Sequence, residues 1–142
     1  MQARLSHISI VVPDLEAALK TMREVYGFSC GAIAENHQQG VRLAYVDLGN
    51  SRIELMQPLA ADSTVGRFLA RHPGGGLHHL CLGVGAIAPA LEELRRQGVR
   101  VLGDGSSTRN IHGQEIAFLN PGDFFGALVE IEQDGHKAAD RC

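Results

Sequence analysis

A single internal repeat constrains this chain more than any other feature of its sequence. The segment Leu5–Leu19 (LSHISIVVPDLEAAL) is echoed by Leu77–Leu91 (LHHLCLGVGAIAPAL), 72 residues later. Overlaying the two copies places His79 on His7 and matches the apolar positions that follow. A chain that repeats once at half its length is expected to build two similar modules that face each other. If the matched histidines face inward, the seam between the modules is a place for a metal ion.

The order of the predicted elements supports this duplication. Residues 7–12 read as a strand, and Asp14 is a suitable N-cap for a helix with apolar residues at helical spacing. The run Pro73–Gly76 marks the boundary between modules. We therefore predict an α+β fold of two paired βαβββ modules, residues 1–73 with a short linking helix and residues 74–133, followed by a polar tail, 134–142. The other expected strands are 28–34, 41–48 and 52–58, then 78–84, 101–103, 115–120 and 127–132. Two further helices are expected: a short one that is capped by Asp62 or Ser63 and runs to Leu69, and one that spans 86–97.

Strand side chains alternate between two faces, and this alternation selects candidate metal ligands. In the first strand the apolar set Ile8, Ile10 and Val12 is expected to pack on the helix, which leaves His7 on the other face. The same parity in the second copy selects His79 rather than its neighbour His78. The last strand of each half likewise carries a lone acid between apolar neighbours, at Glu54 and at Glu130.

Two histidines and two carboxylates at equivalent positions of two repeats predict a shared metal site. Imidazole and carboxylate ligands suit a borderline divalent ion. Taken singly, His7 reads as a half-exposed histidine at a strand end and Glu54 as a solvated strand residue. The fourfold coincidence favours a metal, because a buried carboxylate is costly unless something pairs with it.

Charge and composition exclude several other classes of protein. The net charge is −3 and no basic run occurs, so neither nucleic acid nor an anionic membrane is an expected partner. No apolar stretch approaches the roughly 20 residues that span a bilayer. The three cysteines share no metal-type spacing, which favours reduced thiols. We expect a cytoplasmic protein.

Around the four candidate ligands the chain resembles the vicinal oxygen chelate superfamily (glyoxalase, bleomycin resistance and dioxygenase proteins), and within it the methylmalonyl-CoA epimerases. The resemblance covers nearly all of residues 5–132 and rests on HISIVVPDLEAAL, GNSRIELMQPLAADSTVGRFL, GGGLHHLCLGV and HGQEIAFLNP followed by GALVEIEQ. It implies paired βαβββ modules whose curved mixed sheet surrounds a metal-binding cavity. Carried over by position, the metal ligands of the family are His7, Glu54, His79 and Glu130.

The resemblance also implies a reaction, a cofactor and a partner. The implied reaction is epimerisation of methylmalonyl-CoA, or a close 2-alkylmalonyl-CoA, by removal of the α-proton through a metal-stabilised enolate. Glu130 is the first candidate base and Glu54 the second. The resemblance favours cobalt as the ion, with zinc, nickel and manganese as alternatives, and it implies a homodimer with a small acyl-CoA substrate.

The chain departs from the family at several positions, and these leave alternatives open. In some epimerases a separate glutamate is assigned as the second base, and this chain has Leu43 at that position. Gln114 stands where lysine is frequent in the family, and the segment Asn120–Asp123 stands where a basic residue is common. A lactoylglutathione-lyase-like isomerase would use the same ligand set, and some relatives sequester ligands without chemistry. His112 is expected in an exposed turn, and Cys81 as a small residue of the cavity wall.

Overall fold

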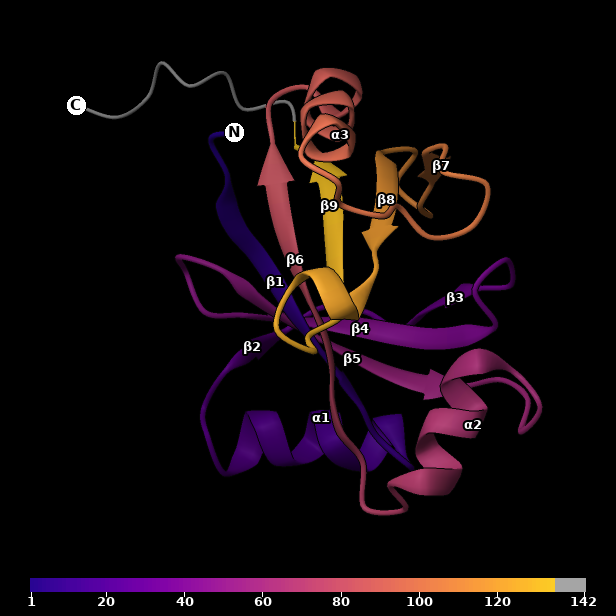
Figure 1. Ribbon diagram of the computed structural model, residues 1–142. Coiled ribbons are helices and arrows are strands. Elements are labelled where there is room, and N and C mark those ends of the chain that lie inside the picture. Colours follow the sequence, from indigo (N-terminus) through magenta and orange to yellow (C-terminus); the bar gives the residue numbers. More distant parts are fainter. Residues whose placement is uncertain (135–142) are drawn as a thin grey trace. The chain divides into compact units, whose positions relative to one another are not determined.

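A computed structural model describes residues 1–134 of the chain, which form three α-helices, one short 3-10 helix and nine strands (Figure 1). The contacts divide the described residues into a first unit, His7–His78, and a second unit that joins Met1–Ser6 to residues 79–134. The predicted α+β class and the repeated βαβββ order are confirmed. The domain boundary at residues 73 and 74 stays a prediction, and the predicted tail lies, apart from Asp134, outside the described residues.

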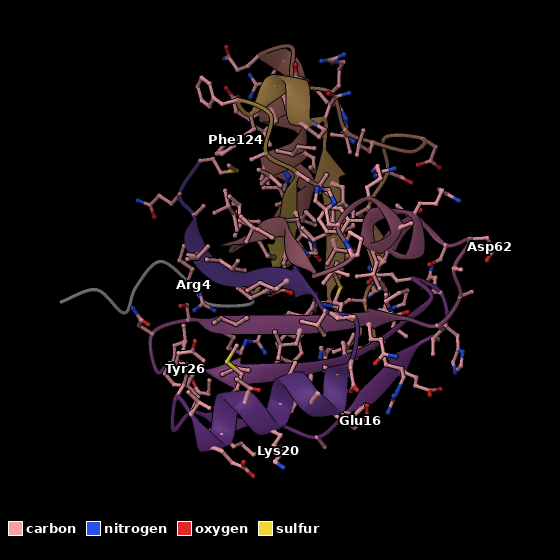
Figure 2. The ribbon with its side chains drawn as sticks, turned by 90° about the horizontal axis from the view of Figure 1, so that it is seen from below. Arg4, Glu16, Lys20, Tyr26, Asp62 and Phe124 are labelled. Atoms are coloured by element: carbon pink, nitrogen blue, oxygen red, sulfur yellow. The ribbon has the colours of Figure 1, made fainter. Side chains whose placement is uncertain are left out.

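Helix α1 of the first unit begins where its sequence predicts. Asp14 is the N-cap, and its carboxylate accepts a hydrogen bond from the backbone N–H of Ala17 at 3.0 Å. Leu15 and Leu19 lie on the buried side of the helix. Figure 2 shows Lys20 projecting from the side of α1 that faces away from the strands. The helix is therefore amphipathic, as its spacing of apolar residues predicts. Its bounds are Leu15–Glu24.

The strands of the first unit hydrogen-bond in the order β2, β4, β5, β1, and β3 also pairs with β4. The pair of β1 and β5 is parallel, and the other pairs are antiparallel. A core of Leu15, Leu19 and Leu55 packs with Ile10 and Val12, so the predicted apolar face of β1 does meet the helix. The bounds are β1 (Arg4–Val11), β2 (Ser29–Cys30), β3 (Ala34–Asn36), β4 (Val41–Asp47), β5 (Arg52–Pro58) and helix α2 (Thr64–Arg71).

The second unit repeats this plan with different details. Its strands pair in the order β6, β9, β8, β7, with β6 and β9 parallel. Helix α3 contacts β9, and its core includes Ile87, Leu91 and Ile131, against which Leu80 and Leu82 pack as their parity predicts. The bounds are β6 (Gly76–Val84), α3 (Ile87–Arg96), β7 (Thr108–Arg109), β8 (Glu115–Leu119), the 3-10 helix η1 (Pro121–Asp123) and β9 (Val129–Gln133).

Two predicted strands are wrong. Residues 28–34 hold only the two-residue β2 and the first residue of β3, and Gly31 lies between them. In place of a strand at 101–103 there is a single bridge from Val101 to Leu119, while the short strand β7 forms further along the chain. In both regions the local residues do not decide the pairing, because a strand forms only where a partner strand accepts it. None of the helices within residues 1–134 is long and apolar enough to cross a membrane.

Candidate functional site

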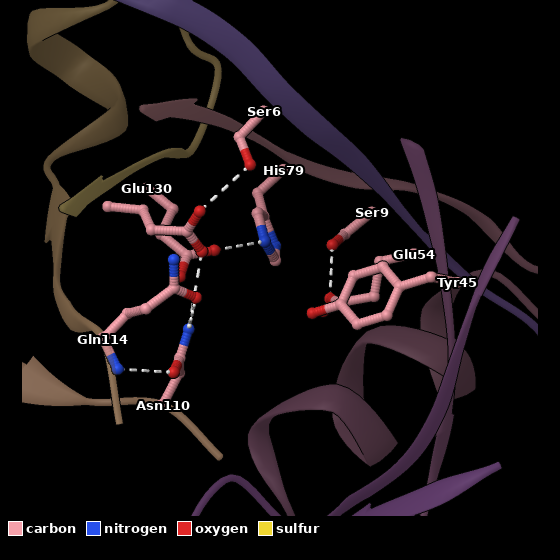
Figure 3. Close-up of polar contacts among 9 residues, drawn as sticks. Ser6, Ser9, Tyr45, Glu54, His79, Asn110, Gln114 and Glu130 are labelled. Carbon is pink, nitrogen blue, oxygen red and sulfur yellow. Dashed lines mark hydrogen bonds and ion pairs between the residues drawn. The ribbon is translucent and has the colours of Figure 1, made fainter. Parts of the chain in front are cut away.

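In the first unit, the carboxylate of Glu54 lies at the centre of a row of polar groups that crosses three strands. Glu54 stands opposite Ser9 of β1 in one ladder and opposite Tyr45 of β4 in the other. The Ser9 hydroxyl donates to Oε1 of Glu54 at 2.6 Å, and the Tyr45 hydroxyl donates to Oε2 at 2.9 Å (Figure 3). Only 7% of Glu54 is exposed. The fold thus holds a buried carboxylate and supplies donors to both of its oxygens.

His7 shares this face of the first unit. It is 2% exposed, and one of its ring nitrogens lies within 4.8 Å of a carboxylate oxygen of Glu54. Its ring meets the ring of Tyr45 edge to face, with centroids 5.9 Å apart. The guanidinium of Arg52 also lies over the Tyr45 ring, with its central carbon 4.3 Å from the ring centroid. The first unit therefore brings His7 and Glu54 together, as the strand parity predicts.

The second unit carries the other predicted pair. Nε2 of His79 is 2.9 Å from Oε2 of Glu130, and both side chains are buried. The ring of Phe118 meets His79 edge to face at 5.5 Å between centroids. Glu130 stands opposite Cys81 of β6 and opposite Phe118 of β8. Each unit thus places one imidazole beside one buried carboxylate, and this donor chemistry fits a borderline divalent ion.

The sequence prediction missed a further buried carboxylate, Glu132, which is 3% exposed. It accepts hydrogen bonds from the Ser6 hydroxyl at 3.1 Å and from the Asn110 amide at 3.4 Å. One of its oxygens also lies within 4.8 Å of the Cys81 sulfur. Glu132 follows Glu130 by two residues, so the same period-two argument could have placed it on the same face. Tyr45 was missed for a different reason, because only the pairing of β4 with β5 shows that it faces Glu54.

The prediction of an exposed turn at His112 is confirmed, and the structure also gives the surroundings of His78, Cys81 and Leu43. His78 packs edge to face against Phe68, with centroids 5.0 Å apart. Cys81 is fully buried. His112 lies exposed in a turn, and its own backbone N–H donates to the side-chain oxygen of Asn110 at 2.9 Å. Leu43 lies in an apolar cluster and offers no acid–base group.

At two exposed arginine–carboxylate pairs, the pKa of the carboxyl group is lowered. The hydrogen bond from the Arg42 side chain lowers the pKa of the Glu16 carboxyl, with oxygen–nitrogen distances of 2.6 and 3.2 Å. The Arg100 side chain likewise lowers the pKa of Asp123, helped by the backbone N–H of Arg100. These pairs fasten α1 to β4 and the end of η1 to the segment after α3. They are structural contacts at the surface.

Comparison with known proteins gives this geometry a family context. A family model described as the glyoxalase/bleomycin resistance protein/dioxygenase superfamily matches residues 6–118. The ethylmalonyl-CoA/methylmalonyl-CoA epimerase of Cereibacter sphaeroides is 43% identical over 133 residues, which are 94% of this chain and 99% of that protein. The mitochondrial methylmalonyl-CoA epimerase of Mus musculus is 38% identical over 92% of this chain and 72% of that protein. A Streptomyces coelicolor methylmalonyl-CoA epimerase variant, solved in complex with 2-nitronate-propionyl-CoA, superposes with a TM-score of 0.85 at 34% identity, covering 96% of this chain and 100% of that one.

Proposed function

Because the chain belongs to the glyoxalase/bleomycin resistance protein/dioxygenase superfamily, we propose that it is an isomerase that epimerises methylmalonyl-CoA or a close 2-alkylmalonyl-CoA. The observation that carries this proposal is the likeness to the Cereibacter sphaeroides epimerase, which extends over almost the whole of both proteins. The buried histidine–glutamate pair in each unit adds chemical support, since a sequestering protein has no need of buried bases. The substrate is a small acyl-CoA.

The proposed reaction inverts the configuration at the α-carbon between a thioester and a carboxylate. Removal of the α-proton leaves a planar enolate, and return of a proton to the other side gives the epimer. Glu130 is proposed as the first base because its carboxylate is buried beside the imidazole of His79, which fixes its position. Glu54 is proposed as the second acid–base group. Leu43 contributes no such group, so the chain's chemistry falls to these two carboxylates.

We propose His7, Glu54, His79 and Glu130 as the ligands of a divalent metal ion. The support is the donor set, in which each unit supplies one imidazole nitrogen close to one buried carboxylate oxygen. When bound, such an ion supplies Lewis-acid stabilisation of the negative charge that develops on the thioester oxygen. The family resemblance favours cobalt, and zinc, nickel and manganese suit the same donors.

The decisive experiment is exchange of the α-proton of methylmalonyl-CoA with solvent deuterium, followed by mass spectrometry. The protein is stripped of metal with a chelator and then reconstituted with cobalt, zinc, nickel or manganese. We expect exchange only with metal, and Glu130→Gln should lower its rate by about 100- to 10,000-fold, the usual contribution of a general base. Glu16→Gln is the control, because it alters an exposed carboxylate on α1 that is not among the proposed ligands, and it should retain exchange.

The outcome separates this function from its competitors. Exchange with a methylglyoxal–glutathione hemithioacetal and none with methylmalonyl-CoA would assign a lactoylglutathione-lyase-like activity instead. Tight binding of the acyl-CoA with no exchange under any of the metals would indicate a sequestering protein. Either result overturns the proposal. A cytoplasmic location and a homodimer complete the proposal, and light scattering of the purified protein measures the second.

A further inference from the structure

The two units surround their pseudo-equivalent carboxylates with different side chains. In the first unit, the neighbours of Glu54 across the ladders are Ser9 and Tyr45. In the second unit, the corresponding neighbours of Glu130 are Cys81 and Phe118. Ser9 of the first unit corresponds to Cys81 of the second, and Tyr45 corresponds to Phe118. At each of the two positions, the first unit has a hydroxyl group that the second unit lacks. The scaffold is repeated, but the hydroxyls are confined to the side of Glu54.

The aromatic ring at this position has the same packing role in both units. Tyr45 meets His7 edge to face with centroids 5.9 Å apart and planes at 73°, and Phe118 meets His79 at 5.5 Å and 88°. A phenyl ring therefore suffices to pack against the histidine. The hydroxyl of Tyr45 is an addition to that packing, and it is directed to Oε2 of Glu54 at 2.9 Å.

The position of the Tyr45 hydroxyl is itself fixed. The guanidinium of Arg52 lies over one face of the ring, 4.3 Å from its centroid, and the edge contact with His7 restricts the ring further. On the other side of the carboxylate, the hydroxyl of Ser9 is 2.6 Å from Oε1 and Ser9 is fully buried. Figure 3 shows the Ser9 hydroxyl joined to the carboxylate of Glu54, with the ring of Tyr45 beside it.

We propose that Tyr45, together with Ser9, is a positioning residue that fixes the rotation of the Glu54 carboxylate; its role in the reaction rests on the proposed function. The last torsion of a glutamate is broad and roughly two-fold, so an unanchored carboxylate samples many orientations. Donors to both oxygens, from strands on opposite sides, define the plane of the group. Each oxygen keeps a second lone pair, which is available to an ion or a proton.

This clamp makes the two carboxylates functionally unequal. Hydroxyl groups on both flanking strands hold Glu54, and the imidazole of His79 lies 2.9 Å from Glu130. A carboxylate with a fixed plane suits a constant ligand. The side chains next to Glu130 in the ladders bear a thiol and a phenyl ring in place of the hydroxyls. The asymmetry is a property of this chain that the repeat alone does not predict.

The test is Tyr45→Phe, which gives position 45 the same side chain as the equivalent position of the second unit, Phe118. The variant keeps the ring, its contact with His7 and its contact with Arg52, and it removes only the hydroxyl. We expect the affinity for cobalt, measured by titration calorimetry on the stripped protein, to fall about 10- to 100-fold, the usual effect of losing a group that orients a metal ligand. The turnover number should fall while KM for the acyl-CoA stays nearly constant. Tyr26→Phe, at the exposed second tyrosine, should change neither quantity.

A double-mutant cycle shows whether Tyr45 acts through Glu54. In the Glu54→Ala background, Tyr45→Phe should have almost no further effect on cobalt affinity. An undiminished effect in that background, or wild-type cobalt affinity and turnover in Tyr45→Phe itself, would overturn the proposal. Should Tyr45→Phe fail to fold, Ser9→Ala tests the same clamp from β1 with the same expected loss.

The two proposals fail in different ways. If the wild-type protein exchanges no α-proton, the proposed function falls, yet cobalt titration of Tyr45→Phe still decides whether the hydroxyl positions Glu54. If the wild-type protein is an active epimerase and the variant binds cobalt as tightly as wild type, the positioning role of Tyr45 is refuted and the proposed function is retained.

Discussion

The glycine run before β6 provides the most demanding test of the fold, because its members are not equivalent. Gly75 has a φ of +88°, a backbone conformation that side chains disfavour. A Cβ atom added there would lie 2.4 Å from the carbonyl oxygen of Val11, at the end of β1. The backbone N–H of Gly75 also donates to the carbonyl of His72 at 2.8 Å. Gly74, in contrast, has nothing within 4 Å of an added Cβ.

The magnitude for Gly75→Ala follows from these two observations. The left-handed conformation costs a residue with a Cβ about 1 to 2 kcal/mol. Relief of the contact with Val11 requires a shift of backbone, since neither partner is a flexible side chain, and overpacking of this kind costs about 1 to 3 kcal/mol. We therefore expect Gly75→Ala to lower the free energy of unfolding by about 2 to 5 kcal/mol. Gly74→Ala should lie within about 0.5 kcal/mol of wild type, or be slightly stabilising.

Urea denaturation followed by circular dichroism and by fluorescence measures both variants, and coincident curves verify a single transition. The slope of the transition should stay constant while the midpoint falls for Gly75→Ala. The reasoning is refuted if Gly75→Ala unfolds at the wild-type midpoint. It is equally refuted if Gly74→Ala is destabilised as much, because the run would then act as a uniform flexible linker.

Two further predictions concern the loop between β8 and β9. Phe125 is fully exposed and has a φ of +55°, so Phe125→Gly should raise the free energy of unfolding by about 0.5 to 1 kcal/mol; a lower melting temperature would show that the ring makes stabilising contacts. The hydrogen bond from Arg100 lowers the pKa of Asp123 in the folded protein, so this carboxylate stabilises the fold above its unfolded pKa of about 4, and the contribution is lost as the pH falls through the folded value. Asp123→Asn should therefore destabilise the protein at neutral pH and make its stability less dependent on pH below about 4, as thermal unfolding between pH 2 and 7 would show; an unchanged acid profile would contradict the assignment.

Local sequence patterns predicted the helices and strands that are determined by residues within the element itself or directly beside it. Asp14 identifies the start of α1 because its side chain caps a backbone N–H three residues away. The period-two alternation assigned His7 and His79 to the face opposite the apolar set without knowledge of any partner strand, and both histidines are buried. The start of β1 could not be predicted in this way. Arg4 and Ser6 are fastened by Asp134 and Glu132, which lie at the far end of the sequence.

The candidate site shows the same limit of sequence reasoning in a sharper form. The identity of Glu54 and Glu130 follows from a lone acid between apolar neighbours. The partners of each acid follow from the register of three strands, which a single sequence does not display. Tyr45 is an ordinary strand residue until the ladder of β4 and β5 sets it opposite Glu54. Residues that support an acid from a neighbouring strand are therefore the ones that pattern analysis misses.

The repeat nevertheless explains why both acids reach equivalent places although their spacings differ. Glu54 follows His7 by 47 residues, and Glu130 follows His79 by 51. In each unit, the acid stands opposite the residue two positions after the histidine, which is Ser9 in β1 and Cys81 in β6. The extra four residues are absorbed between the strands, where added length costs little. A change of one residue within a strand would instead turn the acid to the opposite face. The constraint on this fold is therefore the register of its parallel strands, and the loops between them are where the two copies were free to diverge.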